Sequence, residues 1–239
     1  MIINGYEIKP GANMTGANMP GANMSGANMT RANMPGANMI GANMSGANLS
    51  WANLSKVDLS GANMTEANMT GANMSGANLS KVDLSGANML GANLSKVYLL
   101  GANLSWANMT GANMMGANLF RANLSKVDLS GANMLGANLS KVYLSGANMT
   151  RANLFRANLS GATIGAHKVI NLVARAGRTD GNEFLIFRTN LGHIIRAGCR
   201  TMTLAEYREY VKRYPDPGKV RETTDILDYL EKILLREGF

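Results

Sequence analysis

A five-residue period dominates this sequence and restricts the folds that are open to it. Residues 11–165 divide without a gap into 31 pentads. The second residue of each pentad is Ala or Val, the third is usually Asn, and the fourth is Met fifteen times, Leu fifteen times and Ile once. An internal repeat of this regularity decides the architecture before any single element is considered.

Neither a helix nor a single strand accommodates a period of five. On an α-helix, successive fourth positions would rotate by roughly 140° and spread over every face. On one strand, an odd period would send the Leu and Met side chains to alternate sides. The repeat therefore predicts a solenoid in which each pentad forms one side of a coil, with positions two and four facing inward. Neighbouring coils would pair as parallel β ladders, and the third-position Asn side chains would form ladders of their own.

The first position of the pentad is predicted to face solvent. It is Gly in 19 pentads, and nine of the twelve other residues are Lys or Arg. Long charged side chains do not fit a narrow apolar interior, so these residues point outward. The interior then holds no acid, base or nucleophile, which excludes a catalytic site inside the solenoid.

The pattern A(N/D)(L/M)xx resembles that of the pentapeptide-repeat family. This resemblance implies a right-handed quadrilateral parallel β-helix with four pentads per coil, and hence nearly eight coils in a rod about 37 Å long. It covers about two-thirds of the chain. The predicted fold class is thus an all-β solenoid followed by a small α+β domain. Members of this family serve many purposes, so the resemblance is informative about fold and much less about function.

The charge of the chain distinguishes two hypotheses about nucleic acid, namely mimicry of DNA and binding of nucleic acid. The chain carries a net charge of +8, with residues 11–90 summing to zero and residues 91–165 to +5. Some pentapeptide-repeat proteins resemble B-form DNA and inhibit type II topoisomerases, which requires roughly twenty negative charges on a rod of this length. This solenoid has four acids and nine bases, so its charge has the wrong sign for DNA mimicry. Binding of nucleic acid, or of a nucleic-acid enzyme, through the basic C-terminal half is the alternative function that remains.

Large apolar residues gather at the fifth position of the last coils, where Ser or Thr is usual. Met115, Leu135 and Phe155 are spaced by twenty residues and should stack on one face, while Leu100 and Phe120 should stack on the next. With neighbouring residues they form a candidate interaction patch: Tyr98, Leu100, Met115, Phe120, Leu135, Phe155, Arg121, Arg151 and Arg156. The simpler interpretation is that the C-terminal domain folds back and covers them; the other is that a partner protein binds there.

The period stops after residue 165, and residues 166–239 predict a compact α+β domain. We expect strands over 168–175, 183–189 and 193–197, as a three-strand meander with a hairpin. We also expect helices over 204–213 and 224–236; Thr203 and Glu206 form a capping box before the first helix, and Pro215 and Pro217 break it. This domain would cap the last coil and dock partners, and residues 1–10 would cap the first coil.

No catalytic or metal site is predicted, and no cofactor. The single cysteine, Cys199, is interpreted as a buried structural residue, because its candidate basic partner His193 is six residues away and no third group is apparent. Five arginines of the C-terminal domain suggest one sheet surface that binds an anion or an acidic partner, although a solvated face is the favoured interpretation: Arg175, Arg178, Arg188, Arg196 and Arg200.

The leading functional hypothesis is a non-enzymatic structural or interaction protein, a rigid rod that presents a C-terminal docking module. The stretch at 192–210 resembles C-terminal modules of bacteriophage-encoded repeat proteins, which implies a virion or phage-accessory component. The expected partner is a protein, including a second copy of this chain, rather than nucleic acid or a membrane. No signal peptide or membrane span is apparent, which predicts a location in the bacterial cytoplasm or in a virion.

Overall fold

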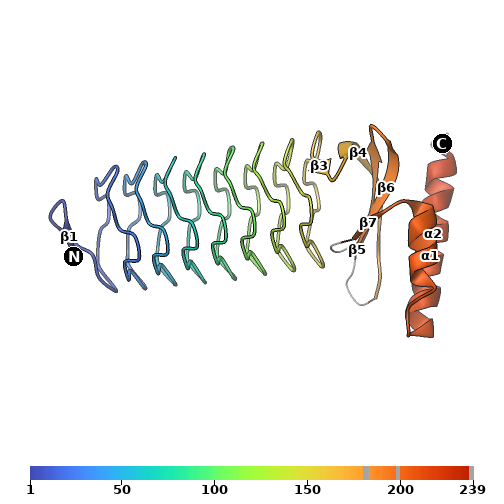
Figure 1. Ribbon diagram of the computed structural model, residues 1–239, viewed down its shortest axis with the longest axis horizontal. Helices are drawn as coiled ribbons and strands as arrows, with labels where there is room; N and C mark the ends of the chain where they lie inside the picture. Colours follow the sequence, from blue (N-terminus) through green and yellow to red (C-terminus); the bar gives the residue numbers. More distant parts are fainter. Residues whose placement is uncertain (180–182, 198–199, 237–239) are drawn as a thin grey trace.

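The computed structural model describes residues 1–179, 183–197 and 200–236. It is an elongated stack of coils that ends in a sheet and two helices, with the two chain termini at opposite ends (Figure 1). The stack is built from isolated parallel bridges that always join residues twenty apart, from Asn13 with Asn33 to Tyr143 with Thr163. Each coil therefore comprises four pentads, and residues 11–165 form nearly eight coils.

Positions two and four of the pentads form one continuous dry core. Their side chains are buried from Ala12 to Ile164, with Ala157 half-buried as the exception, and central members such as Leu84 and Met89 are fully enclosed. Each fully buried Leu or Met contributes about 1.5–3 kcal/mol before conformational entropy is subtracted. The predicted division into inward and outward positions is confirmed.

Position one turns the corner between two sides of a coil in the left-handed backbone conformation. Its φ is +67° at Gly11 and +58° at Lys81, and all twelve non-glycine residues at this position share it. Glycine adopts this conformation without steric cost, whereas other L-residues do so at a cost. The preference for Gly at this position thus has a backbone cause that the sequence pattern alone did not reveal.

Third-position side chains brace the turns and link the coils. The Asn48 side-chain oxygen accepts a hydrogen bond from the Ser50 amide at 3.1 Å, within the same pentad. The Asn53 amide group donates to the Asn33 side-chain oxygen at 2.9 Å, from one coil to the next. Asp58 takes part in the same ladder. Partial burial opposes ionisation of Asp58, but the hydrogen bonds from Ser60 and Asn78 outweigh it and lower its pKa.

A short hairpin precedes the first coil. It is formed by β1 (Ile2–Ile3) and β2 (Tyr6–Glu7), which pair antiparallel. Ile8 joins the solenoid core, and Ile3 and Tyr6 pack partly buried against it. These three apolar residues thus extend the solenoid core at its N-terminal end.

The last coil passes directly into a five-stranded antiparallel sheet. The strands follow the order β3 (Thr163–Ile164), β4 (His167–Gly177), β5 (Glu183–Thr189), β6 (Gly192–Ala197) and β7 (Arg200–Met202). Thr163 belongs to both systems, because it pairs in parallel with Tyr143 and antiparallel with Lys168. The sheet thereby grows out of the last coil.

Alternate residues of the sheet face two different layers. Leu185, Phe187 and Ile194 pack with the solenoid core. Phe184 and Ile186 pack in a second core with the two helices α1 (Leu204–Val211) and α2 (Pro217–Arg236). The sheet therefore lies between the last coil and the helices, and it closes the C-terminal end of the rod (Figure 1).

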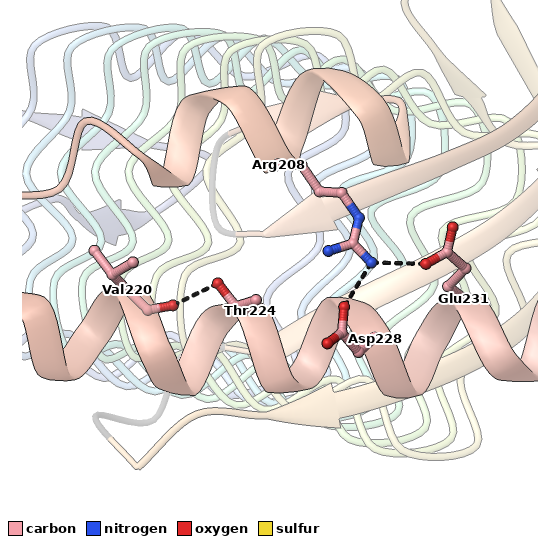
Figure 2. Close-up of polar contacts among 5 residues, drawn as sticks. All are labelled: Arg208, Val220, Thr224, Asp228 and Glu231. Atoms are coloured by element: carbon pink, nitrogen blue, oxygen red, sulfur yellow. Dashed lines mark hydrogen bonds and ion pairs between the residues drawn. The ribbon is translucent and has the colours of Figure 1, made fainter.

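Arg208 on α1 ties the two helices together. Its guanidinium donates to the carboxylates of Asp228 and Glu231 on α2, each at 2.7 Å (Figure 2). Nearer the start of α2, the Thr224 hydroxyl donates to the Val220 carbonyl at 2.8 Å.

The C-terminal elements differ from the predicted ones in three places. The predicted three-strand meander is wrong in extent, since β3 and β7 make the sheet five-stranded. Both added strands are too short to give an alternating pattern in the sequence. Helix α1 ends at Val211, two residues before the predicted end, with Lys212 as its C-cap.

Helix α2 begins at Pro217, seven residues before the predicted start at 224. Proline at the first position of a helix costs no hydrogen bond, because its amide would have no intrahelical partner there. Asp216 caps this start, since its carboxylate accepts hydrogen bonds from the Gly218 and Lys219 amides at 2.9 and 3.3 Å. Both prolines lie beyond the end of α1, as predicted, and Pro217 is in addition the first residue of α2.

Candidate interaction surface

The predicted apolar residues stack along two corners of the rod. The Gly116 amide donates to the Leu135 carbonyl at 2.9 Å, and the Gly136 amide donates to the Phe155 carbonyl at 2.8 Å. These bonds, repeated coil after coil, place Met115, Leu135 and Phe155 directly above one another. The Gly101 amide donates to the Phe120 carbonyl at 3.0 Å, which places Leu100 and Phe120 along the next corner.

The C-terminal sheet and helices leave the patch uncovered. Tyr98 is 55% exposed, Leu100 40%, Met115 39% and Phe155 42%, whereas Phe120 and Leu135 are half-buried. The interpretation that the C-terminal domain folds back over these side chains is therefore wrong. The sheet packs its apolar face end-on against the last coil, so it does not reach along the sides of the rod.

Arginine and lysine side chains lie over the aromatic rings of these coils. The Arg121 guanidinium carbon is 5.1 Å from the centroid of the Phe120 ring, and the Arg156 guanidinium carbon is 5.3 Å from that of Phe155. The Lys141 ammonium is 5.5 Å from the same Phe120 ring. Such contacts are worth about 0.5–1 kcal/mol each at exposed sites. Arg151, the ninth patch residue, is exposed on the neighbouring coil surface.

Two members of this surface were missed by the sequence analysis. Tyr143 is 54% exposed, and its signal was present in the sequence, because SKVYL at 95–99 recurs at 140–144. Lys141 was counted as a solvent-facing cation but not as a partner of Phe120. That contact depends on the twenty-residue stacking of coils, which brings residues 120 and 141 to one corner.

The five arginines of the C-terminal segment do not form one surface. Arg196 is 2% exposed and donates to the Ala147 carbonyl of the preceding coils and to the Thr201 hydroxyl. Arg178 donates to the Thr223 hydroxyl on α2 at 3.1 Å, and Arg200 lies over the Tyr210 ring at 4.3 Å. Arg188 is exposed, and the side chain of Arg175 lies outside the described residues. Among the described side chains the suggested anion-binding surface does not form, because Arg178, Arg196 and Arg200 contact three separate parts of the protein.

A polar cavity of about 430 Å³ opens where the last coil, the sheet and α1 meet. His167, Arg196 and Glu206 are among the residues that line it. Glu206 closes the predicted capping box with Thr203, and the hydrogen bonds from the Thr203 amide and hydroxyl lower the pKa of the Glu206 carboxyl. Two charged residues that line this cavity, Arg196 and Glu206, thus stabilise the fold through their hydrogen bonds.

Of the two residues considered for thiol chemistry, Cys199 and His193, the structure describes His193. Cys199 lies outside the described residues. His193 is half-buried, and its burial, together with the charge of Arg188, lowers its pKa. Across residues 1–179, 183–197 and 200–236 there is no group of three His, Cys, Asp or Glu placed to hold a metal ion. In the same residues no helix has the length and apolar content to cross a membrane.

Comparison with known families matches the chain to the family described as pentapeptide repeats, in eight copies. The matched segments are residues 11–46, 42–80, 77–116, 98–134 and 132–164. No curated protein is significantly similar to the chain.

Several solved structures are similar to the repeat region. QnrB1, described as a plasmid-mediated fluoroquinolone resistance protein, is 20% identical with a TM-score of 0.53, over 64% of this chain and 86% of QnrB1. HetL from the cyanobacterium Nostoc sp. strain PCC 7120, described as involved in heterocyst differentiation regulation, is 28% identical with a TM-score of 0.40, over 69% of this chain and 92% of HetL. The likeness to QnrB1 concerns the fold alone.

Proposed function

Because the chain belongs to the pentapeptide-repeat family, we propose that it is a non-enzymatic interaction protein, a rigid rod that binds a protein partner through its C-terminal coils. Pentapeptide-repeat proteins fold as right-handed β-helices, and we extend this winding, with a four-sided cross-section, to residues 11–165. We propose residues 1–10 as the N-terminal cap and residues 166–239 as the C-terminal capping and docking domain.

The observation that carries this proposal is the exposure of large apolar side chains on one part of a polar rod. Fifth positions are mostly Ser or Thr, which interact favourably with water, yet Met115 and Phe155 stand about 40% exposed at equivalent turns. Leu100 and Tyr98 extend the same surface across the adjoining side. Exposed apolar residues on neighbouring coils mark protein-interaction sites more often than isolated ones do.

The repeat supplies its own conservative variants for a test. Replacement of Met115, Leu135 and Phe155 by Ser introduces the residue most common at the fifth position, so the coils should remain intact. The matched control replaces Ile40 and Leu90 by Ser, because both are fifth-position residues outside the patch and are 45% and 43% exposed.

The measurement is affinity capture from the source cells, followed by titration of the purified captured protein. We expect the natural chain and the control variant to bind this protein alike and the triple variant to bind at least tenfold more weakly. A partner that binds all three chains equally would show that this surface is not the docking site. Circular dichroism checks that all three chains are folded.

A specific observation also supports the second candidate function. Residues 91–165 carry six bases and one acid, and several of these cations lie beside aromatic rings, an arrangement that also suits nucleic acid. Nucleic-acid binding would weaken steeply with rising salt concentration, whereas apolar docking would persist. The proposal of a virion or phage-accessory role rests on the resemblance of residues 192–210 alone.

A further inference from the structure

One corner of the rod brings two cations of adjacent coils onto a single aromatic ring. The Arg121 amide donates to the Ser140 carbonyl at 3.1 Å, so residues 121 and 141 occupy equivalent turns on successive coils. Their charged groups lie 5.1 and 5.5 Å from the centroid of the Phe120 ring. We call Leu100, Phe120, Arg121 and Lys141 the basic corner.

In the described part of the chain, no carboxylate pairs with either cation of the basic corner. Among the residues that the structure describes, neither Arg121 nor Lys141 forms an ion pair. The nearest acid along the sequence is Asp128, whose side chain instead accepts hydrogen bonds from Ser130 and Asn148. Two like charges at one ring repel each other, and an anionic group placed between them would be attracted by both.

The backbone conformation shows that these two cations add strain to the turns they occupy. Arg121 and Lys141 have φ of +60° and +58°, in the left-handed conformation that Gly occupies in 19 of the 31 equivalent turns. A non-glycine residue in this conformation costs roughly 1 kcal/mol or more. Gly at both turns would remove this strain and the mutual repulsion. All twelve non-glycine residues at the first position carry this strain, and at the basic corner two of them also share one aromatic ring.

The charge around the basic corner indicates which class of molecule can bind there. Residues 91–165 sum to +5 and the whole chain to +8, so a second copy of this chain would be repelled. A phosphate backbone would satisfy the cations but would leave the exposed side chains of Leu100 and Met115 in contact with charge or water. A protein segment with carboxylates beside apolar side chains would satisfy both groups.

From these observations we infer that the basic corner binds an acidic protein segment in which carboxylates alternate with apolar side chains. A carboxylate would lie between Arg121 and Lys141, and neighbouring apolar side chains would cover Leu100 and the rim of Phe120. The inference rests on the proposed docking function, and it adds the chemistry of the partner.

The test uses three fluorescent probes with the full chain: a short peptide of alternating Glu and Leu, a poly-Glu peptide of equal charge, and single-stranded oligo-dT. Binding is followed by fluorescence anisotropy. The test variant is Arg121→Gly with Lys141→Gly, which introduces the repeat's own residue at both turns. The control is Arg31→Gly with Lys56→Gly, which removes one Arg and one Lys from equivalent left-handed turns elsewhere on the rod.

We expect the natural chain to bind the Glu–Leu peptide more tightly than either other probe. Loss of two charge-assisted hydrogen bonds should weaken this binding by about tenfold or more in the test variant and leave it nearly unchanged in the control. An equal loss of affinity in both variants would show that the effect comes from net charge alone, and it would overturn the inference. Tighter, corner-dependent binding of oligo-dT would overturn it in favour of nucleic acid.

The outcome is distinguishable from failure of the proposed function. If the captured partner loses affinity for the Met115, Leu135 and Phe155 serine variant but keeps it for the Arg121 and Lys141 glycine variant, the docking surface stands and the acidic-segment inference fails. If neither set of changes affects the captured partner, the surface of the C-terminal coils is not the docking site, and the proposed function fails there.

Discussion

Two glycines at equivalent turns provide a direct energetic test of how the corners are built. Gly71 and Gly91 have nearly the same φ, +64° and +62°. A methyl group added at Gly91 would meet no atom within 4 Å, whereas one added at Gly71 would lie 2.5 Å from carbon atoms of the Trp51 ring. The two Gly→Ala substitutions therefore share the same backbone cost and differ in one contact.

The backbone cost follows from the left-handed conformation. Alanine there loses roughly 1–2 kcal/mol, offset by about 0.4–1 kcal/mol because Ala restricts the unfolded chain. We expect Gly91→Ala to lower the free energy of unfolding by about 1 kcal/mol. Gly71→Ala must in addition displace the Trp51 ring, which is 63% exposed and free to swing outward, so its further cost should stay within about 1 kcal/mol.

The assay is chemical unfolding of the two variants, with Trp51→Ala as a background in which the extra contact is absent. In that background the two glycine substitutions should cost the same amount. Trp51 fluorescence should shift in Gly71→Ala and stay constant in Gly91→Ala. A stabilising Gly91→Ala would refute the left-handed turn, and equal costs in both backgrounds would refute the packing of Trp51 on Gly71.

Three further predictions concern the core, the C-terminal junction and pH. Leu84→Ala should destabilise the rod by about 2–5 kcal/mol, because Leu84 is fully buried, and Leu84→Asp should unfold it. Lys81→Ala should change the midpoint of thermal unfolding little. An equal loss of thermal stability at both positions would contradict the assignment of inward and outward residues. Arg196→Met should leave the Ala147 carbonyl without this donor and cost about 1–3 kcal/mol, seen as faster amide hydrogen exchange in β6; unchanged exchange would count against the link. The pKa of Glu206 is lowered in the folded state, so its stabilising contribution is present above the unfolded pKa and is lost as the pH falls from about 4.5 through the lower folded value. Glu206→Gln should flatten the pH dependence of the unfolding midpoint in that range, and an unaltered profile would exclude the capping box as its source.

The sequence predicted the solenoid well because the second and fourth positions of the pentad each occur 31 times with nearly the same residue type. A single Met or Leu is compatible with many surroundings, but one that recurs every fifth residue beside Ala or Val fixes an inward face. The hairpin of residues 183–197 and the Thr203–Glu206 capping box were predicted for a related reason, since each has a local signature.

Features that depend on distant pairing were not predictable. Strand β7 has three residues, and it exists because it pairs with β6. Arg196 resembles any exposed sheet arginine in sequence, and only the packing of the sheet against the rod buries it beside Ala147. The candidate patch was found from its twenty-residue spacing, but its exposure depended on where the C-terminal sheet lies.

Hydrogen exchange resolved by residue tests the coiled architecture that every other conclusion requires. In the coils after the first, third-position amides donate to the coil before, as Asn53 does to the Ala32 carbonyl at 2.9 Å. The described backbone bonds give no such acceptor to the first-coil amides of Asn13, Asn18, Asn23 and Asn28. We predict rapid exchange at these four amides and strong protection at Asn53 and its equivalents along the rod. Uniform protection, or protection with a helical period, would contradict the stack of four-pentad coils and the corner surface built on it.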